Sequence, residues 1–170
     1  MATTPNPISS KTPGNAVLTA GLHFVEIVGQ VGRPAGFAAL SNEQRKFLLS
    51  ALIGSVVPVD GKVRPCEMEK LRDILSSKMQ SRGKTLEESL TIARSNLGSA
   101  SDLALAANHL PELLSIDDRC AMIGLLWDLA LCDHELHSTE EDLIYRIADH
   151  AGVPRKKVAE QQARAAANVV

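Results

Sequence analysis

The chain has 170 residues, a formal net charge of −2, a hydrophobic fraction of 45% and only 3% aromatic residues. This length predicts a single domain that buries its core without disulfides, and the apolar content excludes an intrinsically disordered chain. The near-neutral charge offers no basic surface for nucleic acid, and no apolar run reaches the ~18 residues that span a bilayer.

The part of the chain before Ser41 differs in composition from the rest. Residues 1–15 are rich in Thr, Ser, Pro and Asn and predict a disordered tail. Residues 16–40 form an apolar segment and a linker, in which 16–31 has helical spacing and Gly and Pro residues then break the pattern. The segment contains His23 and Glu26 and has no convincing cleavage site, so we do not expect a signal peptide.

From residue 41 onward the pattern predicts helices. Ser41 and Gln44 have the spacing of a capping box in front of an apolar helix, which ends at a turn containing Gly61. Pro65 suits the first position of the next helix, and Gly83 suits its C-terminal cap.

The second part of the chain repeats this pattern. Connecting helices are expected over 84–111, and Ser115 caps a strongly apolar helix. Ser138 with Glu141 forms a further capping box, and a terminal helix follows over 154–168. No segment alternates with the period of two that a strand requires, so we predict an all-α single domain of about seven to eight helices over 41–170.

Two Asp–Glu pairs mark an internal repeat. Asp60 precedes Glu67 by the same interval as Asp133 precedes Glu140, so one constant offset superposes the first pair on the second. Each copy consists of an apolar helix, an acidic turn and an amphipathic helix. Residues 41–83 and 115–152 therefore predict two helix–acidic turn–helix repeats, related by a pseudo-twofold axis and packed face to face.

The segments around both pairs resemble the TerB-like tellurite-resistance family. Residues 126–154, which contain LWDLALCDHELHSTEE, are similar to the second half-motif of that family, and VDGKV at 59–63 with Glu67 is similar to the first. The resemblance covers roughly residues 42–167. It implies an all-helical pseudo-twofold fold, shared acidic residues that bind metal, and association with tellurite-resistance or stress-response systems. Family relatives also serve as appended interaction domains.

Three residues depart from the family pattern. His134 stands where the family usually has glycine, so a different backbone conformation is expected in the second turn. Arg64 and His137 stand where an acidic cap residue is common. These changes reduce the negative charge near the proposed site and bear on metal affinity more than on the fold.

The four repeated acidic residues predict a cation site. Asp60 and Asp133 follow the C-terminal ends of apolar helices, and Glu67 and Glu140 lie in the first turn of the next helix. If the pseudo-twofold brings these carboxylates together, their repulsion requires a cation or protonation. An all-oxygen set favours Ca²⁺ or Mg²⁺. The same residues also stabilise turns and helix starts without a ligand, so a purely structural role stays open.

Other side chains near the turns give weaker candidates. His134, Glu135 and His137 flank the second acidic turn and would suit Zn²⁺ or Mn²⁺. Cys66 and Cys132 lie beside the two turns, but no basic neighbour clearly activates both thiols. We interpret the three cysteines as reduced, small apolar side chains, which favours a cytoplasmic location.

Nothing in the sequence predicts an enzyme, because it has no Gly-rich phosphate loop, nucleophile elbow or zincin motif. The first hypothesis is a non-enzymatic signalling or adaptor module that binds a divalent cation. The alternative is a metal-free helical scaffold, either co-chaperone-like or a partner in a membrane-associated stress complex, in which segment 16–31 engages the partner. Neither hypothesis involves nucleic acid or a membrane-spanning helix.

Overall fold

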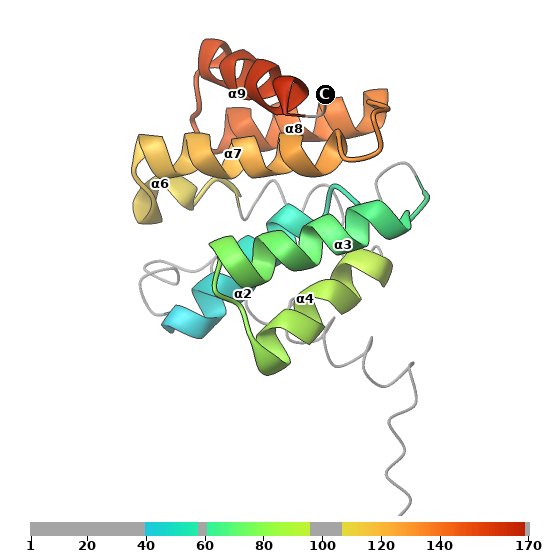
Figure 1. The fold of residues 1–170 in the computed structure, drawn as a ribbon. Helices are drawn as coiled ribbons and strands as arrows, with labels where there is room; N and C mark the ends of the chain where they lie inside the picture. The colour runs from blue at the N-terminus through green and yellow to red at the C-terminus, as the bar shows by residue number, and fades with distance from the viewer. Residues whose placement is uncertain (1–39, 58–60, 96–106, 169–170) are drawn as a thin grey trace, which may run out of the picture.

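The computed structural model describes residues 40–57, 61–95 and 107–168. These ranges contain seven α-helices, one π-helical turn and no strand, which confirms the all-α fold (Figure 1). The elements are α2 (Asn42–Gly54), α3 (Pro65–Asp73), η1 (Ile74–Lys78), α4 (Gly83–Ser95), α6 (Leu110–Leu113), α7 (Ile116–Ala130), α8 (Ser138–His150) and α9 (Arg155–Ala167). The predicted tail 1–15 and apolar segment 16–31 lie outside the described residues. None of the helices in the described ranges is both long and apolar enough to cross a membrane.

The helices form two layers, one from each half of the chain (Figure 1). The first half contains α2, α3 and α4, and the second contains α6 to α9. Helices α3 and α8 begin at Pro65 and Ser138, which are equivalent positions of the internal repeat. Helix α2 packs along α4 as α7 packs along α9, so each half contains a three-helix unit, formed by α2, α3 and α4 in the first and by α7, α8 and α9 in the second. The internal repeat therefore includes a third helix in each copy, beyond the two that the sequence pattern indicated.

Local capping explains where the helices begin. The Ser41 hydroxyl accepts the Gln44 backbone N–H at 3.2 Å, and the Gln44 side chain accepts the Ser41 N–H at 2.9 Å, which confirms the first capping box. The Ser115 hydroxyl accepts the Asp118 N–H at 3.1 Å at the start of α7. The capping box expected at Ser138 is wrong by one residue, because Ser138 is already helical.

The structure places the N-cap of α8 at His137, which has an extended backbone with ψ 138°. The His137 N–H donates to Glu140 Oε2 at 3.3 Å. Helix α3 begins in the same way, since the N–H of its N-cap Arg64 donates to Glu67 Oε2 at 2.7 Å. The two helix starts are therefore equivalent in chemistry as well as in sequence position.

The end of the α3 segment also differs from the expectation. Helix α3 continues into η1, where the Met79 N–H donates to the Ile74 carbonyl at 3.1 Å, and Gln80 with φ 52° ends the helical segment. Gly83 also has a positive φ, of 54°, but it stands at the start of α4. The residue that leaves the helix in the left-handed conformation is therefore Gln80, which precedes the glycine in the chain.

An aliphatic core joins the two layers. Side chains of α2, α3 and α7 contribute Leu52, Ile53, Leu71, Ile123 and Leu126 to this core, all at most 1% exposed. Burying a Leu or Ile side chain fully contributes about 1.5–3 kcal/mol to the stability of the fold. This shared core therefore holds the two halves together. Because α2 and α3 both pack against α7, the start of α3 is held close to the turn that precedes α8.

Candidate functional site

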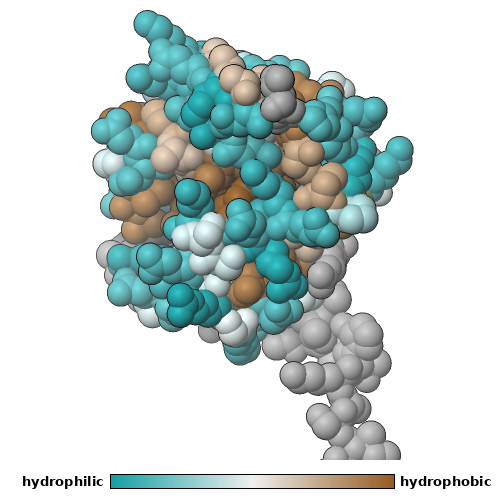
Figure 2. Space-filling view, in the orientation of Figure 1, coloured by the Kyte–Doolittle hydropathy of each residue, from teal (hydrophilic) through white to brown (hydrophobic). Residues whose placement is uncertain are grey.

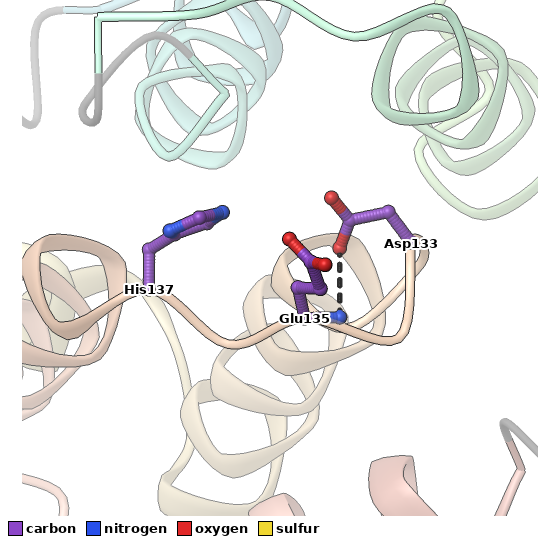
Figure 3. A group of neighbouring side chains, drawn as sticks. All are labelled: Asp133, Glu135 and His137. Carbon is purple, nitrogen blue, oxygen red and sulfur yellow. Dashed lines mark hydrogen bonds between the residues drawn. The ribbon is translucent and has the colours of Figure 1, made fainter.

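The second acidic turn joins α7 to α8 and has a left-handed residue at its centre. The Glu135 N–H donates to Asp133 Oδ1 at 3.1 Å (Figure 3). His134 has φ 66°, and Gly61, its equivalent in the first repeat, has φ 81°. The expected difference in backbone conformation is therefore wrong, since both turns use a left-handed residue at the equivalent position. A histidine adopts this conformation at some cost, whereas glycine adopts it freely.

Three side chains of this turn come together. Asp133, Glu135 and His137 offer ligand atoms that all lie within 4.8 Å of one another. The side chains point toward the helices of the first half (Figure 3). Glu135 is exposed, while Asp133 and His137 are half-buried. In the described ranges this is the one group of three or more His, Cys, Asp or Glu residues with that spacing.

The Arg64 guanidinium lies at the centre of the charged residues. Its Nε is 3.0 Å from Asp133 Oδ2, and its Nη1 is 3.3 Å from Glu67 Oε1. Its Nη2 is 2.7 Å from His137 Nε2. Arg64 and His137 are equivalent residues of the two repeats, 73 positions apart. Their contact therefore lies across the pseudo-twofold axis and joins the N-caps of α3 and α8.

This arrangement places a positive charge next to the carboxylates of the site. A guanidinium has only hydrogen-bond donors, so His137 Nε2 accepts from Arg64 in this contact. The sequence argument required a cation or protonation to bring the carboxylates together. For Glu67 and Asp133, the Arg64 side chain supplies that positive charge from within the protein.

The predicted acidic residues occupy different environments. Glu67 and Glu140 are 2% and 1% exposed, and each accepts the backbone N–H of the N-cap of its own helix. Asp133 is half-buried and lies in the group with Glu135 and His137. Asp60 lies outside the described residues. The structure thus joins Glu67 to Asp133 through Arg64, and gathers Asp133 with two residues that the sequence had ranked lower.

Comparison of the chain with models of protein families gave one match. The family model described as Tellurite resistance protein TerB matches residues 46–163. The chain belongs to the TerB family. The match confirms the kinship inferred from the turn motifs, and it spans both turns and the helices that hold them. Searches of curated proteins and of solved structures gave no match.

This TerB-family chain also brings two thiols together beside the site. Cys66, in the first turn of α3, and Cys132, just after α7, have their sulfur atoms 3.5 Å apart. Burial, the neighbouring Cys66 and the charges of Glu67 and Asp133 together raise the pKa of the Cys132 thiol to about 12. Cys132 is therefore a neutral thiol at physiological pH.

Two contacts of the TerB-family site were not predicted from the sequence. Arg64 was noted only as a departure from the family pattern, although its equivalence to His137 in the repeat was a signal that the two could meet. The contact between Cys66 and Cys132 was not predicted, because these two residues are not equivalent positions of the repeat; the one signal was that each lies beside an acidic turn. Only the packing of α3 against α7 brings them together.

Proposed function

We propose that this TerB-family protein is a non-enzymatic signalling or adaptor module of a tellurite-resistance or stress response, and that it binds a divalent cation at Asp133, Glu135 and His137. The observation that supports the proposal is the spacing of their ligand atoms, within 4.8 Å of one another. With bonds of about 2.1 Å to a tetrahedral metal ion, ligand atoms lie about 3.4 Å apart, so the side chains would have to approach one another by up to about 1.4 Å to complete the site. In this proposal the protein works in the cytoplasm, where its thiols stay reduced.

The ligand types favour a transition metal. One imidazole and two carboxylates suit Zn²⁺ or Mn²⁺ better than Ca²⁺ or Mg²⁺, which prefer oxygen ligands alone. The expectation of Ca²⁺ or Mg²⁺ assumed four carboxylates around one ion. The capping bonds of Glu67 and Glu140 count against that assumption. Zn²⁺ is the first ion to test.

An incoming cation would compete with the Arg64 guanidinium for the same side-chain atoms. Arg64 contacts Asp133 Oδ2 and His137 Nε2, which are atoms that an incoming cation would also use. A bound divalent ion therefore displaces the guanidinium from the second half, while its contact with Glu67 in the first half can persist. Exchange of Arg64 for a metal ion would change how the two halves are linked. That change is the proposed signal to a protein partner.

The test is calorimetric titration of chelator-treated protein with Zn²⁺, Mn²⁺, Ca²⁺ and Mg²⁺. Saturable binding of Zn²⁺ is expected, with loss in Asp133→Asn and in Glu135→Gln. Asp142→Asn is the matched control, because this carboxylate is exposed on α8 and lies outside the group. Arg64→Gln should bind Zn²⁺ more tightly than the parent. Absence of saturable binding at millimolar metal, in the parent and in Arg64→Gln, would reject the cation site.

A groove on another face supports the alternative of a metal-free interaction scaffold. It has a volume of about 830 Å³ and lies between α2, η1, α7 and α9. Its apolar lining includes Leu49, Met79, Leu114, Ile116, Met122 and Leu125. Apolar surface is visible at the junction of the two layers (Figure 2). Such a groove fits an apolar segment of a protein partner, including a component of a membrane-associated complex.

One comparison of variants separates the two functions. Ile116 is 41% exposed on the groove, so Ile116→Asp adds a charge there without disturbing the core. Partner recovery by cross-linking in cells is compared for Ile116→Asp and Asp133→Asn. Loss of the partner in Ile116→Asp alone favours the scaffold. Loss in Asp133→Asn, with recovery that depends on Zn²⁺ in the parent, favours the cation-dependent module.

A further inference from the structure

Cys66 and Cys132 form a pair of thiols that belongs to both halves of the protein. Their sulfur atoms are 3.5 Å apart, with the Cys132 S–H directed at Cys66 Sγ. Neither residue is in a disulfide, and both are half-buried. The pair lies outside the group formed by Asp133, Glu135 and His137. The third cysteine, Cys120, lies alone on the apolar groove and is 8% exposed.

A surface hollow gives access to this pair. It has a volume of about 500 Å³ and is lined by both thiols and by His134. Charged side chains from α3, including Glu69, Lys70 and Asp73, complete its rim. A small molecule that enters the hollow can therefore reach both sulfur atoms at once. The rest of that molecule can be accommodated in the same hollow.

The distance between the sulfur atoms indicates what the pair can bind. A disulfide needs about 2.05 Å between sulfurs, so the pair would have to close by about 1.5 Å to form one. With bonds of about 2.3 Å from each sulfur to a shared atom, a separation of 3.5 Å corresponds to an angle of about 100° at that atom. This angle suits a pyramidal, three-coordinate atom that carries a lone pair.

We propose that Cys66 and Cys132 form a chelating site for a trivalent, thiophilic metalloid, which links the two halves of the protein. A tetrahedral metal ion would need two further ligands. In the described residues no third His, Cys, Asp or Glu joins these thiols with the spacing of a metal site. A monosubstituted trivalent metalloid needs only two thiolates, because its third substituent is already bonded to it. The site is independent of the proposed divalent-cation site.

The reaction with an arsenic(III) oxide of this type is balanced without any change in oxidation state. Two sulfur–arsenic bonds form and the arsenic–oxygen bond breaks. Both thiol protons leave with the oxygen as water, and arsenic stays trivalent. The product is a ring closed through α3 and the turn after α7, and therefore through both halves. Closing a loop between residues 66 positions apart restricts the unfolded chain and raises the melting temperature.

The test uses reduced, full-length protein with one equivalent of phenylarsine oxide, measured by intact mass and by thermal unfolding. We expect a single adduct that survives excess glutathione, is removed by a dithiol such as 2,3-dimercaptopropanol, and raises the melting temperature. Cys66→Ser and Cys132→Ser should each lose the glutathione-resistant adduct, and Cys120→Ser should keep it. Circular dichroism of the serine variants shows that they are folded. An adduct that persists in Cys66→Ser or Cys132→Ser, or its absence from the parent, would overturn the proposal.

Discussion

Replacement of Arg64 by methionine tests whether this side chain is the internal cation that joins the two halves. Methionine keeps an unbranched apolar stem but removes the charge and every donor of the guanidinium. The Glu67 carboxylate then remains buried without the positive charge of Arg64, and Asp133 and His137 lose their contacts with Arg64. We expect a folded protein of clearly lower stability.

The expected loss follows from the exposure of the partners. The Arg64 side chain is 20% exposed, and those of Glu67 and Asp133 are 3% and 16% exposed. Removing one partner of a fully buried ion pair costs about 3–5 kcal/mol, whereas an exposed pair contributes about 0–1 kcal/mol. Because these side chains are partly exposed, we expect Arg64→Met to lower the free energy of unfolding by about 2–4 kcal/mol. For a chain of this size, that loss corresponds to a fall in melting temperature of roughly 4–16 °C.

Urea unfolding measures the change, with circular dichroism and Trp127 emission as two probes. Trp127 is fully buried and packs edge-on against Tyr145, with ring centroids 5.9 Å apart, so its emission reports on the core. Arg72→Met is the matched control, because Arg72 pairs with Glu87 at 3.5 Å on the exposed surface and should cost less than about 1 kcal/mol. Equal stabilities of the two variants would refute the role assigned to Arg64. Saturating Zn²⁺ should recover part of the loss in Arg64→Met if the cation site exists.

Further predictions concern the turns and the caps. His134→Gly should leave stability unchanged or raise it by up to about 1 kcal/mol, because glycine adopts a positive φ without strain. Gly61→Ala should lower stability by about 1 kcal/mol for the converse reason. Thermal unfolding measures both changes. Glu140→Ala removes a buried acceptor of the His137 N–H and should cost about 1–3 kcal/mol in urea unfolding, and a cost below about 0.3 kcal/mol would contradict the capping role. Because burial, the neighbouring Cys66 and the charges of Glu67 and Asp133 raise the pKa of Cys132 from 9.0 to about 12, this thiol should react with iodoacetamide at pH 8 far more slowly in the folded protein than in urea. The folded state should also lose stability as pH rises from 9 to 12, where the unfolded thiol ionises and the folded one does not, and urea titrations across that range test it.

The helices, several of their caps and the internal repeat could be predicted from the sequence because they depend on local interactions. A capping box such as Ser41 with Gln44 is complete within one helical turn, and apolar periodicity is a property of one segment. The constant offset between the two Asp–Glu pairs showed that the two halves are equivalent. The family kinship followed from the same turn motifs and was confirmed over residues 46–163.

The contacts within the candidate site were decided only by the tertiary structure. The sequence pattern grouped four carboxylates by symmetry, but the packing of the halves puts Arg64 beside Asp133 and His137 instead. It also brings Cys66 to Cys132, which no periodicity connects. The sequence by itself determined which segments are helical, because hydrogen bonds and caps act between near neighbours in the chain. Which side chains meet across the pseudo-twofold axis depends on how α3 packs against α7, because that packing sets distances between residues far apart in the chain.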